Sequence, residues 1–216
     1  MTFVTQPLES EPLVHDGTPT VTLWRRATVL TRSVYRRIRE ICQGILHPRR
    51  RRSARARLLR AAPVESVLFI CHGNICRSSY AEFAFRRQAS GVALVVESAG
   101  FVGPDRQPPS VALQVALRRG LDMSAHRSRL LTQPMLDKAG IIVVMSAEQA
   151  AVVRISVRRD VVIVLGDLDP QPITSRTIRD PWSAGADVFE ASYDRIDRCL
   201  PDLMLALGAV PAATHK

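Results

Sequence analysis

The stretch VLFICHGNICRSS, residues 67–79, decides the fold because it joins a buried strand directly to the start of a helix. Its apolar run at residues 67–70 is short and largely β-branched, as buried parallel strands are. Three further runs of this kind lie at residues 93–98, 140–145 and 161–165. Each run is therefore predicted to form a strand of one sheet.

Amphipathic segments alternate with these runs. They lie at residues 80–88, 110–119, 147–153 and 188–207, and they are predicted to be helices. Alternating strands and helices predict an α/β fold, with a single domain over residues 63–210 built on an open parallel sheet. Ligands of such sheets bind beyond the carboxyl ends of the strands, which is where Cys71 stands.

Nearly all of the net charge of +10 is carried by the N-terminal part of the 216-residue chain. Residues 1–62 contain 13 arginines and 4 acidic residues, whereas residues 63–216 contain 17 basic and 16 acidic residues. The basic excess therefore lies in an N-terminal extension of residues 1–62, and the domain that follows is nearly neutral.

Three segments make up this extension. Residues 1–20 are rich in proline, threonine and acidic side chains without periodicity, so they are predicted to be disordered. From about residue 21 to residue 46, apolar side chains recur at spacings of three and four among arginines, which predicts a basic amphipathic helix. Pro48 is expected to end this helix, and the arginine-rich linker of residues 48–62 is expected to stay solvated and extended.

The four cysteines, Cys42, Cys71, Cys76 and Cys199, do not suggest a disulfide framework, because the chain shows no secretory signal and can bury a large core. Reduced thiols and a cytoplasmic location are expected. No apolar run approaches the length of about eighteen residues that a membrane span needs. The five histidines show none of the short spacings of a metal site, so neither a metal nor a cofactor is expected.

The loop after the first strand contains residues that can bind and attack a phosphoryl group. Backbone N–H groups at a helix N-terminus can surround a tetrahedral oxyanion, and Gly73 and Asn74 tolerate the backbone angles that such a cradle needs. Arg77 offers a planar fork to two phosphate oxygens. The same positive field favours the thiolate of Cys71 as a nucleophile, and Ser78 could donate a hydrogen bond to the sulfur. An inert buried cysteine beside a tight turn would not explain the whole Cys-x5-Arg-Ser pattern.

Such a reaction also needs an acid to protonate the departing oxygen and a base to activate water. The segment RDPWSAGAD supplies Asp180, which Pro181 and Trp182 follow. Proline stiffens the loop, and tryptophan can form an aromatic wall beside a phenol ring. By itself the tripeptide would indicate only a turn before a helix. It suggests a catalytic acid only because the chain also contains the Cys71 loop.

These motifs resemble those of the low-molecular-weight protein tyrosine phosphatases. The similarity covers about residues 65–207, nearly the whole domain, and keeps the order of that family's segments. The matching segments are VLFICHGNICRSSYAE (67–82), VESAG (96–100), GLDMSAHRSRLL (120–131), LGDLDP (165–170) and RDPWSAGADVFEASYDRI (179–196).

The resemblance implies a four-stranded parallel sheet flanked by helices and a two-step hydrolysis of phosphotyrosine without a metal. Cys71 would attack the phosphorus to give a cysteinyl-phosphate, and Asp180 would act first as acid and then as base. Trp182 would form a wall for the substrate, a phosphotyrosine protein such as a cognate bacterial tyrosine kinase or a signalling protein. The phosphoryl group would be held by Arg77 and by the loop residues His72, Gly73, Asn74, Ile75, Cys76 and Ser78.

Two positions depart from the family's commonest pattern. His72 replaces a small or apolar residue at the rim, where it is either simply exposed or favours an acidic flank of the substrate. Ser79 replaces a proline, and we expect it to act as the N-cap of the helix, so that the loop keeps its shape. Many family members also have a second cysteine in this loop, at the position of Cys76. Two alternatives remain open for its role: a reversible protective disulfide with Cys71, or packing beneath the loop.

Three other functions share this fold and loop. An arsenate reductase of this type needs two more cysteines downstream, and residues 77–198 contain none. An arginine phosphatase of this type carries threonine where this chain has Ile75, and an apolar residue there suits an aryl phosphate. A catalytically silent phosphotyrosine-binding module is the third, and it has no support because Cys71, Arg77 and Asp180 are all present.

The basic extension leaves several alternatives open. Residues 21–60 could lie on an anionic membrane surface, with Trp24 and the apolar stripe inserted. The extension could instead dock on the acidic tail of a partner such as a tyrosine kinase, or the stripe could pack on the domain. No specific nucleic acid is expected, since phosphate contacts alone bind without sequence preference. A membrane-peripheral location is therefore an alternative to a purely cytoplasmic one.

Overall fold

The computed structural model of the protein describes residues 19–89, 91–157 and 161–208, and for residues 19–33 and 36 it describes the backbone alone. The chain divides into two compact units, residues 1–39 and 40–216. The described part of the first unit is helical. Residues 1–18, which make up most of the segment predicted to be disordered, lie outside the described residues.

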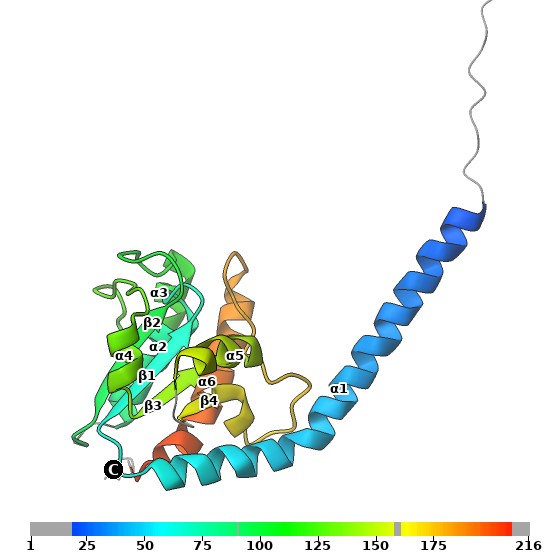
Figure 1. Ribbon diagram of the computed structural model, residues 1–216. Helices are drawn as coiled ribbons and strands as arrows, with labels where there is room; N and C mark the ends of the chain where they lie inside the picture. The colour runs from blue at the N-terminus through cyan, green and yellow to red at the C-terminus, as the bar shows by residue number, and fades with distance from the viewer. Residues whose placement is uncertain (1–18, 90, 158–160, 209–216) are drawn as a thin grey trace, which may run out of the picture. The chain divides into compact units, whose positions relative to one another are not determined.

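Four parallel strands form the sheet of the second unit (Figure 1). The sheet order is β2-β1-β3-β4, so β1 is a central strand that pairs with β2 on one side and β3 on the other. The predicted four-stranded parallel sheet is therefore confirmed. The strands are β1 (Ser66–Cys71), β2 (Val95–Gly100), β3 (Ile141–Val144) and β4 (Val162–Val164).

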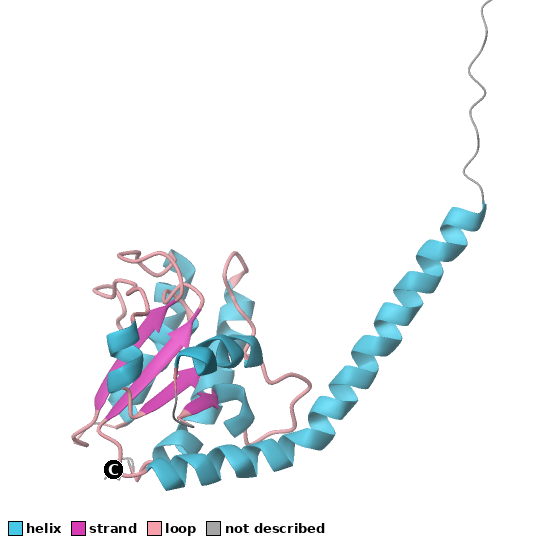
Figure 2. Cartoon of the chain, in the orientation of Figure 1, coloured by secondary structure: helices cyan, strands magenta, loops and turns pink. Residues whose placement is uncertain are grey.

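Helices cover both faces of the sheet (Figures 1 and 2). α2 (Arg77–Gln88) packs on β1 and β2 and contacts α6 (Ala186–Ala206), which in turn contacts α3 (Ser110–Arg118). α4 (Gln133–Lys138) contacts β1, and α5 (Ala147–Ser156) contacts β3 and β4. Right-handed crossovers in this strand order place α4 and α5 on the face opposite to α2.

The predicted helices are confirmed at α2, α3, α5 and α6, but two short elements escaped sequence analysis. These are α4 and the 3₁₀ helix η1 (Leu165–Leu168), which directly follows β4. Each is too short to show a hydrophobic period, because four to six residues cover less than two helical turns. In the part of the chain that the structure describes, no helix is long and apolar enough to cross a membrane.

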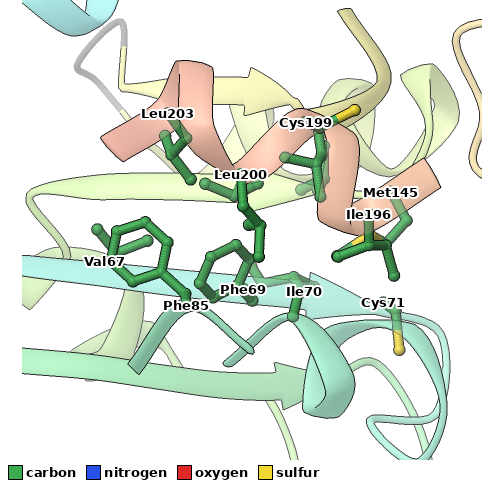
Figure 3. Packing of buried hydrophobic residues seen from close by; sticks show 14 of the residues in the cluster. Val67, Phe69, Ile70, Cys71, Phe85, Met145, Ile196, Cys199, Leu200 and Leu203 are labelled. Carbon is green, nitrogen blue, oxygen red and sulfur yellow. The ribbon is translucent and has the colours of Figure 1, made fainter. Parts of the chain in front are cut away.

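Part of the hydrophobic core lies between β1 and the helices α2 and α6 (Figure 3). The ring centroids of Phe69 and Phe85 are 5.7 Å apart, and Leu200 belongs to the same buried cluster. Cys71 is the last residue of β1 and follows the buried Ile70, with its sulfur at the end of the row of packed side chains (Figure 3). Core packing therefore fixes the backbone from which the Cys71 side chain extends.

The helix α1 runs from Pro19 to Ala61 and contains Pro48 in its interior. The predictions that Pro48 ends the helix and that residues 48–62 stay extended are therefore wrong. An internal proline costs about 3 kcal/mol, and burial of Leu58 and Ala54 contributes a comparable amount. Both side chains are completely buried, and Arg51 also pairs with Asp202 at 2.7 Å. Residues 40–61 thus belong to the unit that carries the sheet.

Candidate active site

Residues 72–76 connect β1 to α2 at the carboxyl edge of the sheet. Asn74 has a φ of 52°, in the left-handed region that asparagine adopts more readily than most residues. The neighbouring strand approaches the loop closely, since a Cβ on Gly100 would lie 2.7 Å from the Asn74 backbone nitrogen. Glycine at position 100 therefore allows β2 to support the loop directly.

The Cys71 sulfur accepts two hydrogen bonds from this loop. The Asn74 backbone nitrogen lies 3.3 Å from Sγ, and the Ser78 hydroxyl lies 3.0 Å from it. Ser78 is completely buried, so its hydroxyl is not shared with bulk water. Because both groups donate, they stabilise a negatively charged sulfur more than a neutral one.

The Asn74 side chain ties the loop to its surroundings. Its Nδ2 donates to Ser78 Oγ at 3.0 Å and to Ser98 Oγ of β2 at 2.7 Å. Its Oδ1 accepts the backbone N–H of Arg129 at 2.8 Å. Both amide protons and the carbonyl oxygen of this buried side chain thus have partners, which holds the loop in shape before a ligand binds.

Three buried side chains outside the predicted site residues support this network: Ser98, Glu82 and His126. Ser98 Oγ donates to the Glu82 carboxylate, which is 4% exposed. The His126 ring Nε2 lies 2.8 Å from the Asn74 backbone oxygen, close enough to donate to it. Sequence reasoning missed Ser98 and Glu82 because a single polar residue in a strand or helix gives no sign of what it will contact.

Arg77 and Asp180 come together although 103 positions separate them in the sequence. Arg77 is 4% exposed; its Nη1 donates to the Ile178 backbone oxygen at 3.1 Å and its Nη2 pairs with the Asp180 carboxylate. Its buried Nε has no hydrogen-bond partner among the described residues. A buried donor without a partner is costly, so the guanidinium retains capacity for an anionic ligand.

Asp180 stands at the start of the segment that leads into α6. Its side chain is exposed, and its second carboxylate oxygen accepts the backbone N–H of Trp182 at 3.2 Å. This local turn and the pair with Arg77 hold the carboxylate between solvent and the Cys71 loop. The predicted acid therefore lies beside the predicted phosphate ligand.

These groups border a pocket of about 210 Å³. Trp182 forms an open wall, because more than half of its side chain is exposed. Among the described residues, no group of three or more His, Cys, Asp or Glu side chains is arranged to hold a metal ion. Apart from Asn74 and Ser78, which lie in the hydrogen-bond network around Sγ, every predicted site residue lines the pocket: Cys71, His72, Gly73, Ile75, Cys76, Arg77, Asp180 and Trp182.

Arg106 also lines the pocket, and the sequence did not reveal it. Its Nη2 donates to the backbone oxygens of Gly73 at 3.2 Å and Val102 at 3.1 Å, while its Nε donates to Gly103 at 2.9 Å. Arg106 thus braces the outer side of the loop and adds a second positive charge near the pocket. It follows a turn without hydrophobic periodicity, so only the fold shows its position.

Cys76 is a buried free thiol in the pocket wall. Burial raises the pKa of Cys76 to about 12, and the Cys71 and Asp180 charges act in the same direction. Cys76 is therefore neutral near pH 7, and a neutral thiol would not compete with Cys71, the predicted nucleophile. Both thiols are free, and the disulfide between them stays a prediction.

The prediction that Ser79 caps α2 is wrong. The helix begins at Arg77, and Cys76 is the cap residue with a non-helical backbone of φ −127° and ψ −78°. Ser79 lies inside the first turn, where its hydroxyl donates to the Cys76 backbone oxygen at 3.2 Å. The loop passes directly into the helix, so the helix begins two residues before Ser79.

Together, the parallel α/β fold and the site define the class of protein: a phosphatase whose pocket is formed by a Cys-x5-Arg loop and an aspartate. The family profile described as Low molecular weight phosphotyrosine protein phosphatase matches residues 66–212. The chain belongs to this family. The match begins at the first residue of β1, so α1 lies outside it.

Similar proteins include both tyrosine and arginine phosphatases. The low molecular weight protein-tyrosine-phosphatase Etp of Escherichia coli K12 is 32% identical over 136 residues, covering 62% of this chain and 88% of Etp. The protein-arginine-phosphatase of Bacillus subtilis is 25% identical over 144 residues, covering 63% of this chain and 93% of that protein. The crystal structure of the Erwinia amylovora tyrosine phosphatase AmsI matches with a TM-score of 0.59 and 27% identity, covering 67% of this chain and 93% of AmsI.

Proposed function

We propose that the protein hydrolyses phosphotyrosine in protein substrates through a cysteinyl-phosphate on Cys71. One observation carries this proposal: the Cys71 sulfur is held by two loop donors in a pocket that Arg77 and Asp180 also line. A nucleophile, a bidentate phosphate ligand and an acid are the three groups that such a transfer requires.

In the first step, the thiolate of Cys71 forms an S–P bond while the bond from phosphorus to the phenolic oxygen breaks. The loop N–H groups and Arg77 stabilise the charge on the three non-bridging oxygens. A bound phosphate would draw Arg77 away from its pair with Asp180. The carboxyl group of Asp180, in its protonated form, then donates its proton to the phenolic oxygen as that oxygen leaves.

In the second step, the carboxylate of Asp180 takes a proton from water while the water oxygen attacks the phosphorus. The S–P bond breaks, and the electron pair returns to the Cys71 sulfur. The Ser78 hydroxyl at 3.0 Å and the Asn74 N–H at 3.3 Å stabilise the departing thiolate. Inorganic phosphate leaves, and the enzyme returns to its starting state.

The walls of the pocket support tyrosine as the phosphorylated residue. Ile75 is buried in the pocket wall, and Trp182 presents an exposed indole ring to it. Apolar and aromatic surfaces suit a phenyl ring, whereas the guanidinium of phosphoarginine would leave polar N–H groups against Ile75. Phosphoarginine is the second candidate, because the Bacillus subtilis relative is an arginine phosphatase.

Phosphate release from matched phosphotyrosine and phosphoarginine peptides tests this proposal. We expect release from the phosphotyrosine peptide, preferred roughly tenfold or more, and none by Cys71→Ser. Ile75→Thr serves as the specificity variant and is expected to shift the preference toward phosphoarginine. A wild-type preference for phosphoarginine would overturn the substrate class, and retained activity in Cys71→Ser would overturn the covalent mechanism. Binding of phosphotyrosine without release would favour the silent binding module.

A further inference from the structure

A second functional surface lies on α1, outside the residues that match the family profile. We infer that the apolar face of α1 over residues 34–46 lies in the headgroup region of an anionic membrane surface. Four side chains, Val34, Ile38, Ile41 and Ile45, follow one another at spacings of four, three and four, and each is more than half exposed. Apolar residues at this spacing form one face of a helix.

Arginines border this apolar face. At 100° per residue, the sector from Ile41 round to the exposed Leu46 spans about 140° of the helix. Arg37 and Arg39 lie on the two sides of that sector, and both are exposed. Arginine side chains in these positions can reach lipid phosphates while the apolar side chains insert among the acyl chains.

The opposite face of α1 already has a partner. Within residues 40–61, His47, Ala54 and Leu58 are buried, and by helical geometry they lie roughly opposite Ile41 and Ile45. The second unit therefore packs on one face of this segment and leaves the apolar face exposed. The sequence left open that the apolar face packs on the domain. Ile41 and Ile45 do not pack in this way, because both side chains are exposed.

The charge of α1 favours lipid over a second copy of the chain. Residues 19–61 contain 13 arginines, and Glu40 is their single acidic residue. Two such helices side by side would bring like charges together, whereas anionic lipid headgroups attract basic side chains. Nucleic acid would satisfy the arginines, but its phosphate backbone offers no apolar layer for the isoleucines.

Sedimentation of the full-length protein with lipid vesicles tests the inference. Vesicles of phosphatidylcholine alone are compared with vesicles that also contain phosphatidylglycerol, at low and at high salt. We expect binding to the anionic vesicles, weakened at high salt because salt screens surface charges. Ile41→Asp places a charge in the inserted face and is expected to weaken binding roughly tenfold or more. The matched control is Ile155→Asp on α5, a residue 87% exposed, which should bind as the wild type does.

Four results would overturn the inference. Equal binding to neutral vesicles would remove the role of anionic lipid, and unchanged binding by Ile41→Asp would remove the role of the apolar face. Loss of binding in the double variant Arg37→Gln, Arg39→Gln without loss in Ile41→Asp would indicate a polyanion that recognises charge alone. A dimer in solution that Ile41→Asp dissociates would assign the face to a second copy. Hydrolysis of p-nitrophenyl phosphate without vesicles checks that every variant folds, independently of the membrane result.

Discussion

Arg77 in the loop and Arg51 in α1 show two uses of a guanidinium group. Arg51 donates through Nε at 2.8 Å and Nη2 at 2.7 Å to one oxygen of Asp202. Arg77 is more deeply buried, yet its Nε has no partner among the described residues and its carboxylate partner Asp180 is exposed. A well-satisfied pair contributes to stability, whereas an incomplete one can still bind an anion. Unused hydrogen-bonding capacity in a buried guanidinium therefore distinguishes Arg77 from Arg51.

Replacing each arginine by lysine tests this comparison most strongly. Arg77→Lys keeps the charge but loses the planar fork, so kcat/KM for p-nitrophenyl phosphate should fall by about 10²–10³-fold. Arg51→Lys should leave kcat/KM nearly unchanged and lower the free energy of unfolding by about 1 kcal/mol or less. Equal losses of activity in the two variants would remove the distinction.

Asp180 and Asp202, the carboxylate partners of Arg77 and Arg51, extend the comparison to a second pair of residues. Asp180→Asn should lower kcat/KM, which reports the first step, for phenyl phosphate on the order of 10²-fold, because the phenolic oxygen then leaves without a proton. The loss should be much smaller for p-nitrophenyl phosphate, whose leaving group needs no proton. Asp202→Asn is the matched control and should affect neither rate. Equal losses on both substrates in Asp180→Asn would contradict its role as the acid.

Residues of α1 should affect stability without affecting chemistry. Leu58 is completely buried, so Leu58→Ala should lower the free energy of unfolding by about 2–3 kcal/mol in urea. The adjacent Leu59 is 60% exposed, and Leu59→Ala should change the free energy of unfolding by less than about 0.5 kcal/mol. Both variants should keep the wild-type kcat/KM well below the unfolding transition. A specific loss of kcat in Leu58→Ala would instead connect α1 to the active site.

His47 gives the smallest expected effect. It is buried in α1, and burial lowers its pKa below the ordinary value. The unfolded chain therefore binds a proton more readily, so stability is lost as the pH falls below about 6.5 toward the folded-state pKa. The urea midpoint should drop between about pH 7.5 and 5.5 in the wild type and drop less in His47→Gln. An identical drop in both proteins would show that groups other than His47 cause the loss of stability at low pH.

Sequence patterns predicted the structure best where the determinants are local. The run at residues 67–70 and the Cys-x5-Arg spacing predicted a strand, a loop and a helix start, and the structure has all three. The rule that proline ends a helix failed at Pro48, because buried contacts of Leu58 outweigh it. Arg106 escaped notice because its role comes from contacts with the loop around Gly73, 33 residues away in the sequence. Such contacts depend on tertiary structure and leave no periodic signal.

The covalent intermediate on Cys71 is tested most directly by trapping it in Asp180→Asn with p-nitrophenyl phosphate. The first step needs no acid with this leaving group, whereas the second step lacks its base, so the cysteinyl-phosphate should accumulate. Mass spectrometry of the rapidly quenched protein should find one phosphoryl group on the peptide that contains Cys71. The group should be absent from the variant that also carries Cys71→Ala, whose side chain has no atom that can accept it. Steady release of p-nitrophenol without phosphorylated Cys71, or a phosphoryl group on another residue, would contradict the mechanism.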